Sequence, residues 1–190
     1  MKKEKLFSTK NLKKDGKREG YWEEISKDGS LSKGNYRNGV PDGLAEFFYP
    51  NGQLKCKFYA KKGAINGLFL AYYENGNLFR KSTLKNGKFN GLNEKYFENG
   101  QLEMSNTYKE DKTHGLSKEY FENGILKSKI NWVEGKLDGV HEEYFGNGQL
   151  RFKSCRYKGK LNGKLEQYNE DGSVLKIENY KDGNLIKNVL

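Results

Sequence analysis

The residues best suited to chemistry are few and lie far apart in the sequence. The histidines are His114 and His141, and the cysteines are Cys56 and Cys155. A zinc site needs three or four ligands, and neither histidine has a cysteine or a second histidine nearby in the sequence. A Cys155–His141 nucleophile pair would need close approach, but the hairpin register below points the two side chains to opposite faces. The sequence therefore predicts neither a metal site nor an enzyme.

Carboxylates are plentiful, and four of them share one position in a repeat: Glu46, Glu94, Glu142 and Glu166. Paired carboxylates serve glycosidases, but these are better explained by cross-strand partners, with Glu46 facing Lys57 and Glu142 facing Lys153. Such pairs are ordinary on a solvated face. No glycine-rich segment has the strand-to-helix context of a phosphate-binding loop, so neither a cofactor nor a small-molecule substrate is expected.

The elements that must position these residues recur along the chain. The motif Asn-Gly-x-Leu, or a near variant, begins at seven positions whose spacing is 23 residues once and 24 residues five times: Asp28, Asn51, Asn75, Asn99, Asn123, Asn147 and Asp171. A fixed step of this size indicates a repeat protein in which each unit packs on its neighbours. Such a fold has extended surfaces and no obvious single pocket, which favours binding over catalysis.

The sequence of each repeat predicts a β-hairpin. Asn99-Gly100 lies between two runs of aromatic and aliphatic residues and favours a two-residue type I′ turn. Phe97 then opposes Leu102, and farther out Lys95 opposes Met104. The second connection, such as residues 86–91, is predicted to be longer. We therefore expect an all-β fold, an elongated open antiparallel meander of about seven 24-residue hairpin repeats with about 15 strands.

Side chains alternate across a strand, so each repeat position forms a column. One face is predicted to carry an aromatic column beside an aliphatic one: Tyr49, Tyr73, Phe97, Phe121 and Phe145, with Leu31, Leu54, Leu78, Leu102, Leu126, Leu150 and Val174. The other face carries Phe48, Tyr72, Tyr96, Tyr120, Tyr144 and Tyr168, with Leu44, Leu68, Leu92, Leu116 and Val140. These columns are expected to be mainly structural, because each repeat must bury its own share of the core.

A glycine also stands at the start of each predicted hairpin, where we expect positive φ or a close approach of the backbone. These glycines are Gly20, Gly43, Gly67, Gly91, Gly115, Gly139 and Gly163. In the connection between hairpins, Asp111 replaces the glycine found at Gly87 and Gly135, and aspartate tolerates the left-handed region. We assign residues 1–14 to a charged N-terminal tail or cap and residues 15–190 to the repeat array, with residues 171–190 as its C-terminal cap.

Composition agrees with a folded and basic repeat protein. Only 34% of the residues are hydrophobic and the mean hydropathy is −0.99, but aromatics reach 14% and fall at fixed repeat positions, unlike those of a disordered chain. The cysteines lie about four repeats apart, roughly 38 Å at two strands per repeat, so both are expected to be free thiols. No apolar run suits a signal peptide or a membrane span, so we expect a soluble, cytoplasmic protein.

The basic residues offer the sharpest binding candidate. The net charge is +10, and one column holds Lys57, Lys81, Lys129 and Lys153, flanked by Lys55, Lys127 and Arg151. This column is predicted to lie on the face of Tyr72, Tyr96, Tyr120 and Tyr144. Lys118 would oppose Lys129 without an acid to neutralise the pair. Such a strip could hold an anionic partner by charge and stacking; alternatively, Glu46 and Glu142 cancel part of the charge while lysine stems cover the tyrosines.

The repeat resembles the MORN repeat, and in particular the bacterial MORN-variant repeat found in tandem in YwqK-type antitoxin-family proteins. Residues 95–103 (KYFENGQLE), 119–127 (EYFENGILK) and 85–91 (KNGKFNG) carry the resemblance, which covers about residues 15–185. It implies a hairpin array without catalysis that acts through protein or lipid contacts.

Two functions follow as hypotheses. The first is a protein-binding module, such as an antitoxin, immunity or inhibitor-type protein whose partner is a toxin or effector. The second is a binder of anionic surfaces, either lipid headgroups or nucleic acid, through the lysine column. Affinity that falls steeply with salt would favour the second, whereas binding that persists at high salt would favour the first.

Overall fold

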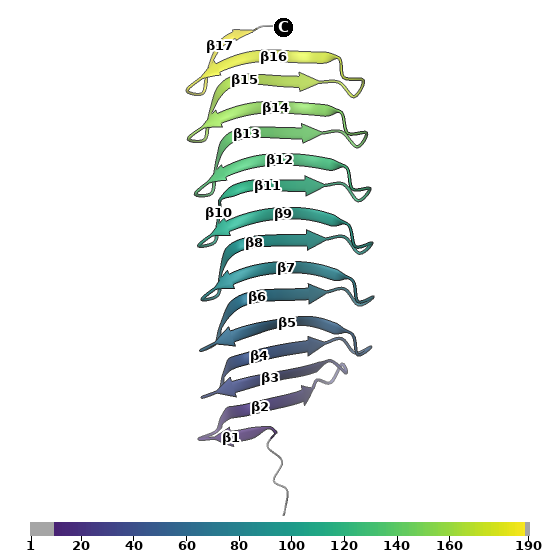
Figure 1. The fold of residues 1–190 in the computed structure, drawn as a ribbon, viewed down its shortest axis with the longest axis vertical. Coiled ribbons are helices and arrows are strands. Elements are labelled where there is room, and N and C mark those ends of the chain that lie inside the picture. Colours follow the sequence, from purple (N-terminus) through teal and green to yellow (C-terminus); the bar gives the residue numbers. More distant parts are fainter. Residues whose placement is uncertain (1–9, 189–190) are drawn as a thin grey trace, which may run out of the picture. The chain divides into compact units, whose positions relative to one another are not determined.

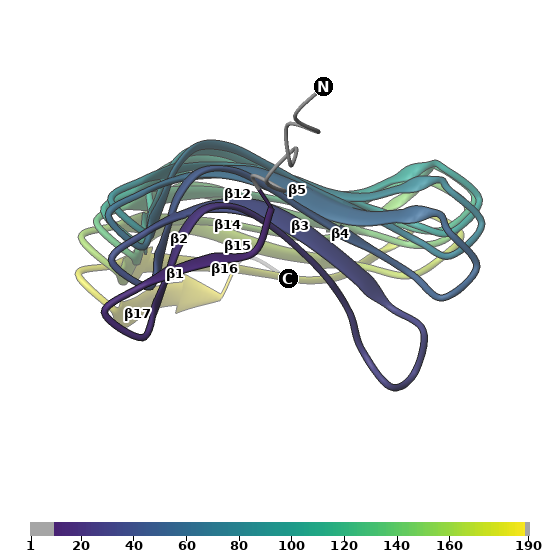
Figure 2. The same ribbon diagram turned by 90° about the horizontal axis from the view of Figure 1, so that it is seen from below.

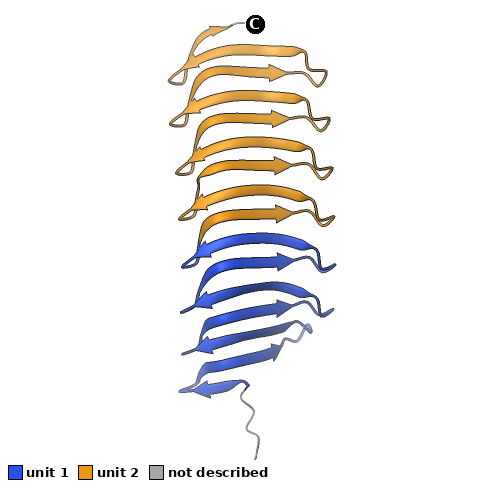
Figure 3. Ribbon diagram, viewed as in Figure 1, with its two compact units in different colours: residues 1–88 blue, residues 89–190 orange. Residues whose placement is uncertain are grey.

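The structure is a computed structural model that describes residues 10–188. Those residues contain 17 β-strands and no helix (Figure 1). In that range there is accordingly no helix of the length and apolarity needed to cross a membrane. The chain divides into two compact units, with unit 1 ending at residue 88 and unit 2 beginning at residue 89 (Figure 3).

Unit 1 is an antiparallel sheet in which each strand pairs with the next along the chain. Its strands are β1 (Leu12–Lys14), β2 (Lys17–Ile25), β3 (Leu31–Arg37), β4 (Val40–Phe48), β5 (Leu54–Lys61), β6 (Ala64–Tyr72) and β7 (Leu78–Lys85). Most of the predicted N-terminal tail, residues 1–9, lies outside the described residues. The boundary placed after residue 14 falls at the turn between β1 and β2.

Unit 2 has the same meander topology. Its strands are β8 (Lys88–Tyr96), β9 (Leu102–Lys109), β10 (Lys112–Thr113), β11 (Gly115–Tyr120), β12 (Leu126–Val133), β13 (Lys136–Tyr144), β14 (Leu150–Tyr157), β15 (Lys160–Tyr168), β16 (Val174–Lys181) and β17 (Asn184–Asn188). Both β10 and β11 pair with β9, because the chain leaves the ladder at His114. β17 pairs only with β16 among these strands, so the sheet is open, as predicted.

Each unit is a single layer of strands, which bow along their length (Figure 2). Extensive contacts occur only between neighbouring strands of a sheet. Among the described residues, the buried hydrophobic side chains are only Ala45, Ala60 and Leu84. Large side chains are therefore half-buried against their cross-strand neighbours, and such pairs stabilise a sheet by about 0.2–1 kcal/mol each. A single layer leaves both faces accessible to a partner.

The two turns of each repeat differ from the prediction. The connection predicted to be longer is a two-residue type I′ turn, as at Glu134 and Gly135, where φ is 50° and 77°. The Asn-Gly connection is a three-residue loop instead. In the Asn99-Gly100 loop only Gly100 has positive φ (87°), and Phe97 N–H donates to the Gln101 carbonyl at 2.8 Å. Asn-Gly serves both turn types, so the dipeptide alone does not select one.

A β-bulge follows the three-residue loop and changes which side chains share a face. Tyr96 pairs with Leu102 and Lys95 pairs with Met104, so Glu103 is the extra residue. The predicted Phe97–Leu102 pair is therefore wrong, whereas the Lys95–Met104 pair is confirmed. The extra loop residue and the bulged residue compensate each other, which restores the predicted register beyond the bulge.

The leucine column consequently lies on the opposite face from the one predicted. It pairs with the tyrosine column in both units: Leu54 with Phe48, Leu78 with Tyr72, Leu102 with Tyr96, Leu126 with Tyr120, Leu150 with Tyr144 and Val174 with Tyr168. We call this side the tyrosine face. The other side is the phenylalanine face, named for the column that contains Phe97, Phe121 and Phe145 in unit 2.

The loop asparagine both shapes its own turn and links adjacent repeats. Asn99 Oδ1 accepts from Gln101 N–H at 2.9 Å, and Asn99 Nδ2 donates to the Glu122 carbonyl of the next repeat at 3.3 Å. Asn51 and Asn147 make the same inter-repeat bond, each at 3.1 Å. An aspartate would keep the acceptor and lose this donor. The linkage gives a physical reason for asparagine at these three loops.

The predicted backbone role of glycine is confirmed at Gly139, where φ is 108° and an added Cβ would lie 3.1 Å from Asn131 Cβ. The predicted tolerance of aspartate is also confirmed. Asp111 has a φ of 64°, and its Oδ1 accepts from Phe89 N–H at 2.7 Å. That hydrogen bond stabilises the one connection in which the usual glycine is absent.

Gly139→Ala should destabilise unit 2, because alanine resists positive φ and its Cβ would crowd Asn131. The free energy of unfolding, measured by urea denaturation, is expected to fall by about 1–3 kcal/mol. Gly146→Ala is the control, since Gly146 has no positive φ and an added Cβ would meet nothing within 4 Å. Equal effects of the two substitutions would contradict the assigned backbone geometry.

Candidate binding faces

The tyrosine face of unit 2 carries a charged network across three strands. On β13, Tyr144 Oη donates to Glu142 Oε2 at 3.1 Å. The Nζ atom of Lys153, on β14, lies 3.0 Å from Glu142 Oε1. The Nζ atom of Lys129, on β12, lies 3.5 Å from Glu142 Oε2. The predicted Glu142–Lys153 pair is therefore confirmed, and the tyrosine and lysine columns share this face.

The network corrects one prediction about charge. Lys118 opposes Lys129 across β11 and β12, as predicted. The expectation that no acid compensates this pair is wrong, because Glu142 lies on the other side of Lys129 and reaches its ammonium group. One largely buried carboxylate thus pairs with two lysines, and the lysine column in this part of unit 2 is partly neutralised.

The same contacts shift the pKa values of the network. Burial acts to raise the pKa of Glu142, but hydrogen bonds from Lys153 and Tyr144 and the charges of Lys153 and Lys129 hold it below its ordinary value. Burial, together with the hydrogen bond to Glu142 and its negative charge, raises the pKa of Tyr144. The hydrogen bond to Glu142 also raises the pKa of Lys153. The carboxylate and the ammonium therefore both remain charged at neutral pH.

Each unit carries exposed leucines beside its tyrosines. In unit 1, Leu44 and Leu68 are 38% and 47% exposed, and in unit 2 Leu92 and Leu116 are 41% and 37% exposed. Each leucine lies four residues before Phe48, Tyr72, Tyr96 or Tyr120 on the same strand. Because side chains alternate across a strand, the leucines lie on the tyrosine face. This face therefore offers apolar and aromatic surface interspersed with charged groups.

The predicted site residues of unit 1 also lie on this face. Lys57 opposes Glu46 on β4 and Leu70 on β6, and Lys81 opposes Leu70 from β7. Tyr72 ends β6. A shallow hollow of about 230 Å³ lies between Lys57, Leu44 and Leu68, among other side chains.

Arg151 was predicted on the tyrosine face and lies on the phenylalanine face instead. Tyr144 pairs with Leu150 and Glu143 pairs with Phe152, so Arg151 is the bulged residue and points to the same side as Phe152. Its guanidinium carbon lies 5.9 Å from the centre of the Phe145 ring. The flanking residues Lys55 and Lys127 are displaced in the same way, over the rings of Tyr49 and Phe121 respectively.

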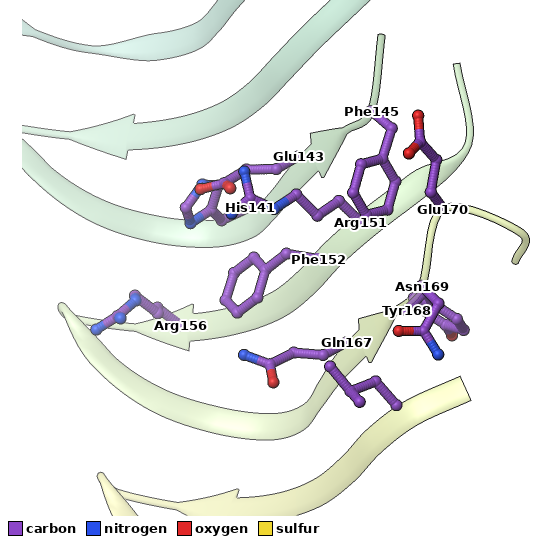
Figure 4. A pocket seen from close by; sticks show the side chains of 11 residues that line it. His141, Glu143, Phe145, Arg151, Phe152, Arg156, Gln167, Tyr168, Asn169 and Glu170 are labelled. Carbon is purple, nitrogen blue, oxygen red and sulfur yellow. The ribbon is translucent and has the colours of Figure 1, made fainter. Parts of the chain in front are cut away.

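The phenylalanine face contains two clusters that the sequence analysis missed. In unit 1, the rings of Phe47, Phe58 and Phe69 stack in series, with centres 5.9 and 6.0 Å apart. In unit 2, a hollow of about 520 Å³ is lined by residues of β13, β14, β15 and β16 and of the loops after β13 and β15 (Figure 4). At these positions the residue type changes from repeat to repeat. That lack of repetition could have marked the clusters in the sequence, but only positions that repeat were assigned to columns.

His141 lies in the second cluster. Its Nε2 is 3.1 Å from Glu143 Oε1, and its ring meets the Phe152 ring edge-on at a centre distance of 5.1 Å. Burial lowers the pKa of His141, and the charge of Arg156 adds to this effect, while Glu143 opposes it. His141 opposes Ser154 and Cys155 opposes Val140, so the prediction that His141 and Cys155 point to opposite faces is confirmed.

Cys56 and Cys155 are both free thiols. Within residues 10–188, no group of three or more histidine, cysteine, aspartate or glutamate side chains is arranged to hold a metal ion. The geometry of the two faces offers surfaces and shallow hollows for contact with another molecule.

Comparison with known families gives a match over most of the chain. Six tandem segments match the MORN repeat variant: residues 41–62, 65–86, 89–110, 113–134, 137–158 and 161–182. Each segment contains one of the loop motifs identified above, and the motif at Asp28 lies before the first segment. A search of curated proteins gives no significant match.

The stability of unit 2 should depend on pH through Glu142. Its folded-state pKa is depressed, so its contribution is present above the unfolded-state pKa of about 4.3 and is lost as pH falls through the folded-state value. Urea denaturation of Glu142→Gln should show a lower free energy of unfolding than wild type at neutral pH. The difference should shrink as pH falls below about 4.

Glu46→Gln is the matched control, because Glu46 occupies the same repeat position and has no ion pair among the described residues. It should lower the stability less than Glu142→Gln at neutral pH. A Glu142→Gln difference that stays constant down to strongly acidic pH would show that the network does not hold the carboxylate ionised.

Proposed function

Because the chain belongs to the MORN-repeat-variant family, whose tandem hairpins form open sheets suited to binding or scaffolding, we propose that it is a non-catalytic protein that docks a protein partner on its tyrosine face. The observation that carries this proposal is the combination, within each unit, of exposed leucines and half-buried tyrosines on one side of its strands. Tyrosine is enriched at protein interfaces because its ring supplies apolar area while its hydroxyl can hydrogen-bond.

The chemistry of this face favours a protein over an anionic surface. Binding to phosphates depends on lysines whose charge is available to them. In unit 2 Lys129 and Lys153 share Glu142, so part of their charge is already compensated. Paired charges beside apolar residues are better suited to orienting a protein partner, whose surface carries both signs. Lipid headgroups and nucleic acid remain the alternative that the test below separates.

We further propose that the partner is a toxin or effector that the chain neutralises, as an antitoxin, immunity or inhibitor-type protein would. The support is the resemblance of its tandem repeats to those of antitoxin-family proteins. Repeats of one kind can carry unrelated functions, so the identity of the partner requires direct capture.

The test is affinity capture from the native host at low and high salt, with the retained proteins identified by mass spectrometry. We expect one protein to be retained at high salt and its affinity to fall about tenfold in Tyr120→Ala and in Tyr144→Ala, a loss typical of a central interface tyrosine. Lys127→Ala, on the phenylalanine face, is the control and should bind like wild type.

Two results would contradict the proposal. Retention that disappears at high salt, with nucleic acid or lipid recovered instead, would favour an anionic surface. Unchanged binding in both tyrosine variants, each shown to be folded by circular dichroism, would place the interface elsewhere.

A further inference from the structure

The two faces differ in how their residue types repeat. On the tyrosine face, tyrosine, leucine, glutamate and lysine recur at the same positions. On the phenylalanine face, the position of His141 is occupied in other repeats by Ala45, Phe69, Asn93, Ser117 and Leu165. The position of Arg156 is occupied by Ala60, Leu84, Tyr108, Trp132 and Tyr180. Residues needed to hold a repeat fold together recur in each repeat, so the fold itself does not require His141 or Arg156.

His141 changes the charge pairing of its own repeat. In the preceding repeat, Lys127 Nζ of β12 lies 2.8 Å from Glu119 Oε1 of β11, the strand pair equivalent to β14 and β13. The equivalent acid, Glu143, lies 3.1 Å from His141 Nε2 instead. Arg151, which occupies the position of Lys127, has no ion-pair partner among the described residues, and its guanidinium carbon lies 5.9 Å from the centre of the Phe145 ring. The histidine thus engages the acid that would otherwise neutralise Arg151.

The unpaired guanidinium lies at a hollow of suitable size. The hollow has a volume of about 520 Å³, within the range of small-ligand sites, and its lining includes Arg151, Arg156, His141 and Phe152. Figure 4 shows the Arg151 side chain extended toward His141, with Phe152 beside it. Arg156 Nη1 donates to the Gly159 carbonyl at 3.1 Å, which restrains the second guanidinium.

The acids around the hollow limit what it can hold. Glu143 is engaged by His141, and in Figure 4 Glu170 lies on the opposite side of the hollow from His141. Arg151, Arg156 and the His141–Glu143 pair lie toward one end of the hollow, where two guanidinium groups face one carboxylate, and the rings of Phe145 and Phe152 supply apolar surface next to them. A ligand that fits must be anionic at one end and apolar beyond it.

We propose that this hollow binds an oxyanion, either a carboxylate or a phosphate, on a small apolar body that packs against Phe145 and Phe152. The Arg151 guanidinium donates to two oxygens of the anion at once, which is the geometry that arginine favours. Arg156 supplies the second positive charge, and His141 positions the site by holding Glu143 away from Arg151. The site is distinct from the tyrosine face and does not depend on the function proposed for that face.

The test uses phenyl phosphate, benzoate and inorganic phosphate as probes of the full chain, with binding followed by NMR. Phenyl phosphate or benzoate should shift the ring signals of His141 and Phe152 and the side-chain N–H signal of Arg151. Inorganic phosphate, which lacks the apolar body, should bind more weakly. The stronger of the two aromatic probes identifies the anion that the site prefers.

Matched variants separate this site from general attraction to a basic protein. Arg151→Gln should weaken binding of the better aromatic probe about tenfold, the usual loss for one hydrogen bond to a charged group. Lys127→Gln, at the same repeat position but ion-paired, should leave the affinity unchanged. His141→Ser, which restores the residue of the preceding repeat, should free Glu143 to pair with Arg151 and so weaken binding as well.

Three results would overturn the proposal. The first is the absence of shifts with every probe. The second is equal weakening by Arg151→Gln and Lys127→Gln, which would show general electrostatic attraction. The third is unchanged binding in Arg151→Gln with circular dichroism like that of wild type.

Discussion

The backbone conformation of the turns decides which face each side chain occupies. Side chains alternate across a strand, so a shift of one residue moves a whole column to the other side of the sheet. Here a three-residue loop with one glycine at positive φ is followed by a β-bulge, and a two-residue type I′ turn closes the other end of the hairpin. These two turns place leucine with tyrosine and move Arg151 to the opposite face from Lys153.

A single layer of strands has little interior, so stability and function draw on the same side chains. Within the described residues few apolar side chains are buried, so the sheet is held together by half-buried side chains that pack against their cross-strand neighbours. The tyrosine face repeats its residue types, as a surface that also holds the sheet together must. On the phenylalanine face, the positions away from the phenylalanine column vary from repeat to repeat, which leaves room for local sites such as the one around Arg151.

Most of the fold could be predicted from the sequence because its signals repeat. The spacing of the loop motif, the alternating aromatic residues and the tolerance of Asp111 for positive φ all led to the observed hairpins. The turn types could not be predicted, because Asn-Gly fits a type I′ turn as well as the end of a three-residue loop. The faces of Leu102 and Arg151 depend on that choice. The contact of His141 with Glu143 was missed because the two share a strand and histidine occurs at its repeat position only in this repeat.

Hydroxyl-radical footprinting of the side chains, in the complex with the captured partner, measures directly which face of the sheet is the interface. Tyr120 and Phe121, like Tyr144 and Phe145, are adjacent in sequence but lie on opposite faces of unit 2. If the tyrosine face is the interface, the partner protects Tyr120 and Tyr144 from oxidation while Phe121 and Phe145 remain as reactive as in the isolated protein. Protection of the phenylalanines with the tyrosines unchanged would contradict this assignment.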